Sequence, residues 1–382
     1  MKSVVSFLLV VALCACSSVF AQTFEPVPDP PQVPAKGYLL IDFNSGSILA
    51  ELNADERLEP ASLTKIMTGY VVFREIAAGK IALTDQVLVS ERAWRTGGSK
   101  MFIEVGKLVS VQDLLMGMIV QSGNDASVAL AEHVAGSIEA FADLMNRYAQ
   151  QLGMTASHFT NPHGLPDPEL YITARDIAKV ATAIIREFPE YYSWYSTREF
   201  TFNGITQQNR NPLLKLDPSA DGIKTGYTQA AGYCLVSSSK REDMRLVTVV
   251  MGSPTAKARA EASQALMNYG FRFYESQRLY PADQAVETLR VWSGRQKLLP
   301  VGPQTDVFAT FQRGRYGELS AQIEKGERIQ APIQRGTPVG SIVVKVAGEE
   351  VNRVPLVALQ DVDQGNLWHR LRDAILGLFV KA

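Results

Sequence analysis

The stretch Pro60-Ala61-Ser62-Leu63-Thr64-Lys65-Ile66-Met67-Thr68 decides how the rest of the 382-residue chain is interpreted. Pro60 suits the first position of a helix, and a separation of three residues places Ser62 and Lys65 on one helical face. A serine hydroxyl is a poor nucleophile until a neighbouring base removes its proton. The pair is therefore a candidate nucleophile and general base near a helix start, where free N–H groups favour developing negative charge.

Two further polar motifs follow downstream, Ser122-Gly123-Asn124 and Lys224-Thr225-Gly226. A serine and a lysine at this spacing arise by chance roughly once or twice in a chain of average composition. This chain contains such a second pair, Ser237 with Lys240, which we interpret as a polar strand end and loop. The conjunction is more specific than any one motif, because the three occur in order on a helix, after a helix and on a strand. It predicts an enzyme.

The two motif lysines need opposite charge states. Lys65 acts as a base at neutral pH only if its pKa falls about 3 units from its reference value, which requires roughly 4 kcal/mol. A second cation ~6 Å away supplies about 2.8 kcal/mol at an effective dielectric of ~20. We expect Lys224 to be that cation, with partial burial of Lys65 supplying the remainder. Lys224 itself should stay charged and hold an anionic group of the substrate.

The remaining motif positions suggest proton transfer and substrate binding. The Ser122 hydroxyl can relay a proton between the lysines and a leaving nitrogen, while the Asn124 amide can bond Lys65 and a substrate backbone. Gly226 leaves a strand edge without a side chain, where an extended peptide can pair. The backbone N–H groups of Ser62 and Tyr227 are then the candidate oxyanion hole.

Strands at both ends of residues 37–283 enclose a helical middle, which predicts an α/β sandwich built on one antiparallel sheet. Start and stop signals set the expected helices: Ser110, Ser137 and Thr173 as caps, with a last helix from Ala256 that stops at Gly270. Residues 284–362 carry short strands separated by turns, which predicts a small all-β domain.

Both ends of the chain suggest export and a membrane. Residues 1–21 have the positive start, apolar stretch and small-residue cleavage site of a signal peptide; a lipoprotein signal that uses Cys14 or Cys16 is the alternative. Residues 22–36 are Pro-rich and are expected to form an extended linker. Residues 363–382 place apolar side chains at helical spacing and predict an amphipathic helix on a bilayer surface. Packing on its own domain or on a partner is the other interpretation.

Bulk properties exclude some classes. The net charge of -1 gives no indication of nucleic-acid binding. The four histidines and three cysteines show no spacing suited to a metal site, so neither metal nor cofactor is expected. Cleavage of the signal would leave Cys234 alone, so an intrachain disulfide is not expected.

The motifs resemble those of the penicillin-recognising serine enzymes, and more closely the low-molecular-mass D-alanyl-D-alanine carboxypeptidases. Pro60–Thr68, Gln121–Ala126, Asp221–Gly226, Phe200–Ile205 and Tyr269–Phe273 carry the likeness. It implies a β-lactamase/transpeptidase-like α+β catalytic domain, a β-rich second domain and a C-terminal anchor at the periplasmic face of the inner membrane. Peptidoglycan stem peptides ending in D-Ala-D-Ala would be substrates and β-lactams would be inhibitors.

The resemblance assigns roles to single residues. Ser62 would be the acylated nucleophile, Lys65 the base, Ser122 the proton relay and Lys224 the contact to the substrate carboxylate. Thr225 and Gly226 belong to the same substrate-binding motif. Tyr227 departs from the family pattern, since well-known members carry histidine there, and the loop between Trp94 and Met101 looks shorter.

Three further positions have two interpretations each. Arg210 either holds a carboxylate or braces the sheet. Asp176 lies near a family active-site loop, yet a first-turn acid beside the Thr173 cap is the simpler interpretation. His163 matches a family loop and is interpreted as a turn histidine.

Other activities remain as rivals. A DD-transpeptidase or endopeptidase uses the same acyl-enzyme. A class A β-lactamase needs a glutamate in a Glu-x-x-Leu-Asn context, and none lies between Ser122 and Lys224. A wall-binding scaffold without catalysis is the rival from a different class.

Overall fold

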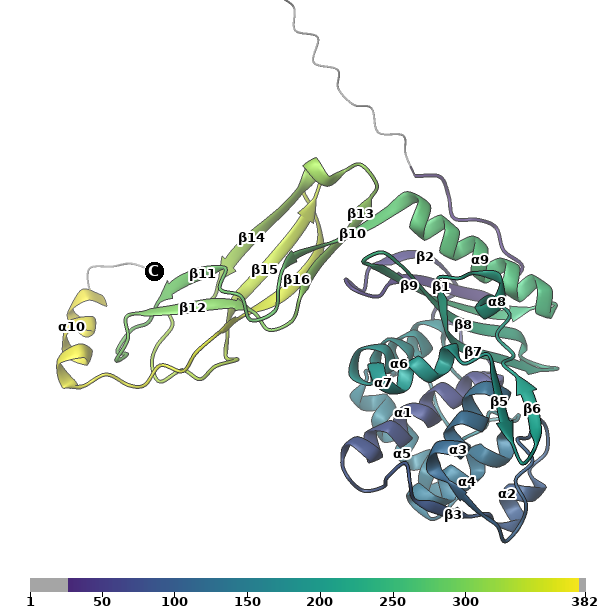
Figure 1. Ribbon diagram of the computed structural model, residues 1–382. Helices are drawn as coiled ribbons and strands as arrows, with labels where there is room; N and C mark the ends of the chain where they lie inside the picture. Colours follow the sequence, from purple (N-terminus) through teal and green to yellow (C-terminus); the bar gives the residue numbers. More distant parts are fainter. Residues whose placement is uncertain (1–26, 378–382) are drawn as a thin grey trace, which may run out of the picture.

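The computed structural model describes residues 27–377, which form a mixed α/β domain followed by an elongated all-β domain (Figure 1). The sheet of the first domain is antiparallel, with strand order β2-β1-β9-β8-β7. Its strands are β1 (Gly37–Asp42), β2 (Ile48–Leu52), β7 (Ala220–Thr228), β8 (Gly232–Arg241) and β9 (Met244–Ser253). The predicted sandwich on one antiparallel sheet is confirmed, and β7 is an open edge.

Helices cover both faces of this sheet (Figure 1). Helix α9 (Ala256–Phe273) packs on one face through an apolar cluster that includes Leu40, Leu246 and Leu266. The opposite face packs against the helical middle through a larger cluster that includes Ile66, Val71 and Phe73 of α1 (Thr64–Ala77). The other elements of this lobe are η1 (Ala61–Leu63), β3 (Gln86–Leu88), α2 (Glu91–Arg95), β4 (Leu108–Ser110), α3 (Val111–Met116), the π-helical turn η2 (Gly117–Gln121), α4 (Asn124–Ala135), α5 (Ile138–Gln151), α6 (Ala174–Glu187), α7 (Pro189–Tyr192), η3 (Ser193–Ser196), β5 (Glu199–Phe202), β6 (Ile205–Gln208) and α8 (Leu213–Leu216).

Capping side chains begin three helices where the sequence predicts them. The hydroxyls of Ser110, Ser137 and Thr173 accept from backbone N–H groups three residues ahead, at 3.0, 3.1 and 3.1 Å. Each bond satisfies one of the free donors at a helix start. The predicted caps are confirmed.

The predicted stop of the last helix at Gly270 is wrong. Helix α9 continues through Gly270 to Phe273. A Cβ at position 270 would lie 2.6 Å from Leu246 Cδ1, so the glycine is present because the helix lies close to the sheet.

The Pro-rich segment before β1 is extended but packed, in contrast to the expected linker. Val27, Val33 and Ala35 lie against the cluster under α9, and the Tyr269 hydroxyl donates to Pro28 O at 3.0 Å. Apolar side chains between the prolines explain this packing, because each contact with α9 removes apolar surface from water.

The all-β domain begins at Tyr274, ahead of the expected position 284. Strand β10 (Tyr274–Tyr280) pairs with β13 (Val307–Gln312) directly after α9. A second sheet has the order β11-β12-β16-β15-β14. Its strands are β11 (Glu287–Arg290), β12 (Leu298–Pro303), β14 (Leu319–Lys325), β15 (Pro338–Val346) and β16 (Glu349–Ala358), with the short turn η4 (Tyr316–Glu318) before β14.

Helix α10 (Leu367–Gly377) lies at the end of this domain away from the first domain (Figure 1). Its side chains Leu367 and Trp368 are more than three-quarters exposed, at 77% and 76%. Asp373 is buried and accepts from the Ser293 backbone N–H at 2.8 Å. The helix therefore contacts its own domain through the buried carboxylate of Asp373, while Leu367 and Trp368 are exposed. Among residues 27–377, no helix is both long and apolar enough to cross a membrane.

The predicted signal peptide, the lipoprotein alternative at Cys14 or Cys16, and the last five residues of the predicted anchor lie outside the described residues.

Candidate active site

Ser62 lies in the tight turn η1 that precedes α1, one residue after Ala61, whose φ of 47° is in the left-handed region. Lys65 follows in the first turn of α1, and its Nζ lies 3.0 Å from Ser62 Oγ. The structure therefore brings the predicted nucleophile and base into direct contact, with the serine in a 3-10 turn before the helix.

Lys65 is buried, with 2% of its surface exposed, and three oxygens surround its amine. Besides Ser62, the amine donates to Asn124 Oδ1 at 2.7 Å and to the backbone oxygen of His163 at 2.6 Å. Burial lowers the pKa of Lys65 well below its ordinary value, with Lys224 and Arg210 as further causes and Asp125 opposing them. The expected ranking, with the charge of Lys224 first and burial second, is thus reversed.

Lys224 is also buried, and its pKa falls to about 7, chiefly through burial and then through Arg210 and Arg259. Its amine donates to the Thr225 backbone oxygen at 3.1 Å. Burial and the two neighbouring guanidinium groups thus oppose the charge that Lys224 is expected to keep. A bound carboxylate stabilises the charged form and raises this pKa again.

Ser122 and Asn124 enter the site where the π-helical turn η2 ends. Ser122 takes a left-handed conformation, with φ 68°, and starts the chain into α4. The Asn124 amide bonds Lys65 through its oxygen and donates to Gly97 O at 2.7 Å through its nitrogen. The predicted contact between Asn124 and Lys65 is confirmed, and Asn124 also holds the loop that contains Gly98 beside the site.

A loop of residues 161–165 forms the wall behind Lys65. Asn161 Oδ1 accepts from the N–H groups of His163 and Gly164, which fixes the turn and aims the His163 carbonyl at Lys65. Gly164 has φ +83°, and a Cβ there would overlap the Ala61 carbonyl oxygen. His163 is a turn residue, as interpreted, yet its backbone oxygen contacts Lys65. Burial and Lys65 lower the pKa of its imidazole to about 3.

Strand β7 passes the nucleophile turn at Gly226. A Cβ at this glycine would lie 3.1 Å from Pro60 O and 3.2 Å from Ser62 N. Gly226 therefore has two functions: it keeps the edge strand open, and it lets the strand approach Ser62 closely. The next side chain, Tyr227, is 55% exposed and lies against its cross-strand partner Tyr233, with ring centroids 4.3 Å apart.

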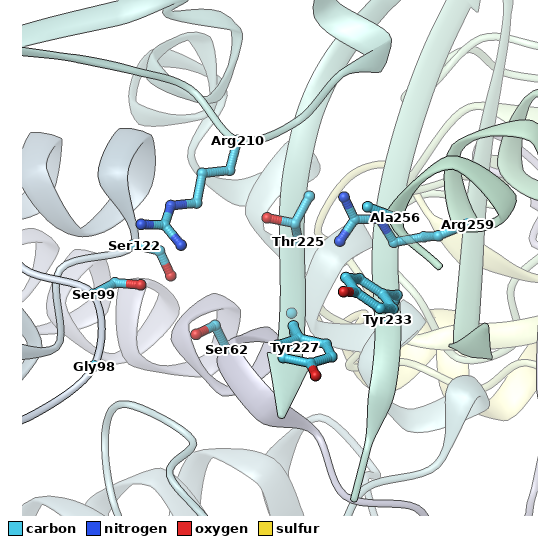
Figure 2. A pocket seen from close by; sticks show the side chains of 11 residues that line it. Ser62, Gly98, Ser99, Ser122, Arg210, Thr225, Tyr227, Tyr233, Ala256 and Arg259 are labelled. Carbon is cyan, nitrogen blue, oxygen red and sulfur yellow. The ribbon is translucent and has the colours of Figure 1, made fainter. Parts of the chain in front are cut away.

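A cavity of about 540 Å³ opens between these elements. In Figure 2 the Ser62 and Ser122 hydroxyls lie on one side with the Arg210 guanidinium group close to Ser122, and the Arg259 guanidinium group points toward Thr225 from the other side. The cavity is lined by Ser62, Gly98, Ser99, Ser122, Arg210, Thr225, Gly226, Tyr227, Tyr233, Ala256 and Arg259. Two cations that flank a hydroxyl form a surface suited to a carboxylate.

Arg259 was missed by the sequence interpretation. It lies on α9, is only 6% exposed, and has a buried Nε without a hydrogen-bond partner among the described residues. Its sequence context, Ala-Arg-Ala in the middle of a helix, carries no local signal. The only indication in the sequence was the position of this arginine: it lies in the helix that follows the motif strands, on the side that faces the sheet.

Two other predictions concern residues away from the cavity. Asp176 lies in the first turn of α6 beside the Thr173 cap and accepts from Ala156 N and Ser157 Oγ, both at 2.9 Å, so the interpretation as a first-turn acid is confirmed. The second serine–lysine pair is structural, because Ser237 is fully buried on β8 and its hydroxyl is 2.6 Å from that of Thr248, but both residues lie within the strand and not at the predicted strand end and loop.

The fold and site together define an active-site-serine enzyme of the penicillin-recognising class. Residues 24–255 match the family model described as D-alanyl-D-alanine carboxypeptidase, and residues 274–364 match that of the penicillin-binding protein 5 C-terminal domain. The chain is 42% identical over 385 residues to the D-alanyl-D-alanine carboxypeptidase DacA of Haemophilus influenzae, covering 98% of both chains. The chain belongs to this carboxypeptidase family.

Solved structures agree with this assignment. Penicillin-binding protein 5 from Haemophilus influenzae superposes with a TM-score of 0.82 at 43% identity, covering 88% of this chain and 100% of that one. Penicillin-binding protein D2 from Listeria monocytogenes, solved in an ampicillin-bound form, matches with a TM-score of 0.59 at 27% identity, covering 64% of this chain and 100% of that one. The predicted family, fold class and serine-type carboxypeptidase activity are therefore confirmed.

Proposed function

We propose that the carboxypeptidase reaction proceeds through an acyl-Ser62 intermediate on peptidoglycan stem peptides that end in D-Ala-D-Ala. The observation that carries this proposal is the buried amine of Lys65 at 3.0 Å from Ser62 Oγ. A lysine with a lowered pKa removes the serine proton as the hydroxyl attacks the penultimate carbonyl carbon. Ser122 then passes a proton to the nitrogen of the departing D-alanine.

The peptide lies along β7 in this proposal. Its backbone pairs with the open edge at Thr225 and Gly226, and the N–H groups of Ser62 and Tyr227 bind the oxyanion. The terminal carboxylate lies between Arg210 and Arg259, against Thr225 and above Lys224. Binding there returns a full charge to Lys224, so substrate binding and the protonation of that lysine are coupled.

Water then attacks the acyl-serine and releases the shortened peptide. A β-lactam acylates Ser62 in the same way, but its leaving nitrogen stays attached to the acyl group. The chain is thus proposed to take part in cell-wall biogenesis and cell shape, and to be inhibited by β-lactams.

Two measurements on one preparation test the chemistry. Incubation with benzylpenicillin should add one penicilloyl mass on Ser62, and a peptide ending in D-Ala-D-Ala should release D-alanine. A Ser62→Ala variant that keeps its melting temperature should do neither. Folded wild-type protein that forms no adduct would establish a non-catalytic scaffold. Transfer of the acyl group to an added amine in preference to water would establish a transpeptidase.

Location is the second part of the proposal. The chain is exported with the help of residues 1–21 and lies on the periplasmic face of the inner membrane through α10. Exposed Leu367, Trp368 and Leu371 support this placement, because apolar side chains on one helix bury themselves at a bilayer interface. Cell fractionation should place the mature chain with membranes, from which deletion of residues 363–382 releases it. A truncated chain that stays with the membranes would argue for the lipoprotein alternative.

A further inference from the structure

The far end of the all-β domain presents a second set of exposed groups beside α10. Arg290 and Leu298 are cross-strand partners on β11 and β12, so their side chains share one face of the sheet. Both are exposed, Leu298 by 61%. We define the distal patch as Arg290, Leu298, Arg328, Leu367, Trp368 and Leu371.

Two arginines of this patch flank one tryptophan. The guanidinium carbons of Arg290 and Arg328 lie 3.8 and 3.5 Å from the ring centroid of Trp292, which is itself buried. This stacking holds two long side chains in place without an acidic partner for Arg328 among the described ion pairs. The patch therefore holds two guanidinium groups in place at the surface, that of Arg328 without a described acidic partner and that of Arg290 near Asp373.

The patch and α10 form one surface because the helix is attached to the domain. Asp373 accepts from Ser293 N at 2.8 Å, lies 3.6 Å from a nitrogen of Arg290, and is 2% exposed. The segment before the helix is also bonded, since Gly365 N donates to Ser293 O at 2.8 Å. The apolar edge of α10 thus has a defined orientation relative to the arginines.

Large exposed apolar side chains are concentrated at this end. Of those in the described part of the chain from Tyr274 on, Leu298, Leu367, Trp368 and Leu371 lie here and Tyr316 lies elsewhere. Three acidic residues lie nearby. Glu327 precedes Arg328 in the sequence, Asp363 precedes α10, and the carboxylate of Asp373 is buried. Arg295, Lys297 and Arg370 add to the positive charge. Apolar groups edged by cations match the boundary of an anionic bilayer.

We propose that the all-β domain itself binds anionic lipid headgroups through Arg290 and Arg328, so that α10 and the domain engage the bilayer as one surface. This proposal rests on the proposed location at a membrane. It adds a headgroup-dependent contact from the domain to an anchor that would otherwise depend chiefly on the apolar area of α10.

The test is sedimentation of the mature full-length chain with vesicles of phosphatidylcholine, and with vesicles containing one-third phosphatidylglycerol. Wild type should bind the anionic vesicles more tightly, and 0.5 M salt should abolish the difference. Arg290→Gln/Arg328→Gln should bind the anionic vesicles about thirty-fold more weakly, which corresponds to about 1 kcal/mol for each cation. Its binding to phosphatidylcholine should not change.

The matched control is Lys107→Gln/Lys257→Gln, which removes two exposed cations from the catalytic domain and should bind as wild type does. Equal binding of wild type and the double arginine variant to anionic vesicles would overturn the proposal and leave the α10 anchor standing. Failure of wild type to bind either kind of vesicle would overturn the anchor itself. Leu371→Asp should weaken binding to both kinds.

Discussion

The active site and the distal patch each contain a pair of cationic side chains. The two pairs differ in burial, and this difference determines their function. Lys65 and Lys224 are 2% and 3% exposed, and the pKa of each is lowered. Arg290 and Arg328 lie at the surface and stack on an aromatic ring. Burial disfavours the charged form of the first pair, whereas the second pair lies in contact with water.

Residue type follows from this difference. A lysine ammonium loses its proton readily when it is desolvated, but a guanidinium does not. Base catalysis therefore requires lysine in the buried site, and a permanent charge is better supplied by arginine at the surface. Predictions that exchange or remove these groups test the comparison, and they follow from the largest expected effect to the smallest.

Lys65→Arg should abolish most activity, because arginine cannot accept the serine proton. We expect acylation of Ser62 by a β-lactam to slow by about 10²–10⁴-fold, the usual contribution of a general base. Stopped-flow acylation rates measure this directly. Lys257→Arg, on the exposed surface of α9, is the control and should have no effect. An arginine variant with near-normal acylation would mean that Lys65 only positions Ser62.

Lys224→Ala should weaken turnover of peptides by about 10–100-fold, since a bond to a charged group contributes about 1.5–3 kcal/mol. It should also move the acid limb of the pH–acylation profile to higher pH. The sign follows because the charge of Lys224 lowers the pKa of Lys65, and its removal lets that pKa rise. The movement should be modest, because burial of Lys65 is the larger cause.

Acylation rates by a β-lactam across pH 5–9 provide the profile, and the apparent affinity for a peptide ester without a free carboxylate provides the control. An acid limb that does not move would restrict Lys224 to carboxylate binding.

His163→Gln should make the protein more resistant to acid. The folded-state pKa of His163 is about 3, below its ordinary value of 6.5, so the unfolded chain binds a proton that the folded chain refuses. The resulting loss of stability begins below pH 6.5 and grows until about pH 3, at up to about 1.4 kcal/mol per pH unit. Urea unfolding at pH 7 and pH 4 should show a smaller pH dependence in the variant. Equal dependence in both chains would exclude His163 as the cause.

Asp373→Asn should leave catalysis unaffected and release α10 from its domain. The lost charge weakens the contacts to Ser293 and Arg290, while soluble peptide turnover should stay within about two-fold because the active site is in the other domain. Limited proteolysis should cut residues 363–373 faster than in wild type. Arg353→Gln, on β16 of the same domain, is a control that should not change the cutting rate there. Unchanged proteolysis would show that α10 stays in place without this bond.

Much of the fold and the reacting groups follows from sequence, because local signals mark them. Capping serines and threonines fixed the helix starts, alternating apolar residues fixed the sheet, and three motifs placed Ser62, Lys65, Ser122 and Lys224 in one site. These features depend on hydrogen bonds within a few residues, or on a periodicity that needs no knowledge of distant contacts.

The parts that sequence misjudged depend on packing between distant segments. Gly270 was interpreted as a helix stop. The position instead requires a residue without a side chain, because Leu246 packs directly against it. Arg259 has no motif, and only the approach of α9 to the sheet brings it to the cavity. Burial outweighs charge in lowering the pKa of Lys65, since desolvation is a property of the completed core and not of spacing along the chain.

The strand order β2-β1-β9-β8-β7 also bears on when the enzyme becomes active. Strand β1 pairs with β9, which lies some two hundred residues later in the chain. The hairpin of β1 and β2 can therefore join the sheet only after β9 is available. A ribosome or a translocation channel releases the chain from its N-terminus, and the sheet stays open until residue 253 has emerged. Until then Lys65 is in contact with water, which favours its charged form. If Lys65 is the base, as proposed, Ser62 should become reactive only when the sheet is complete.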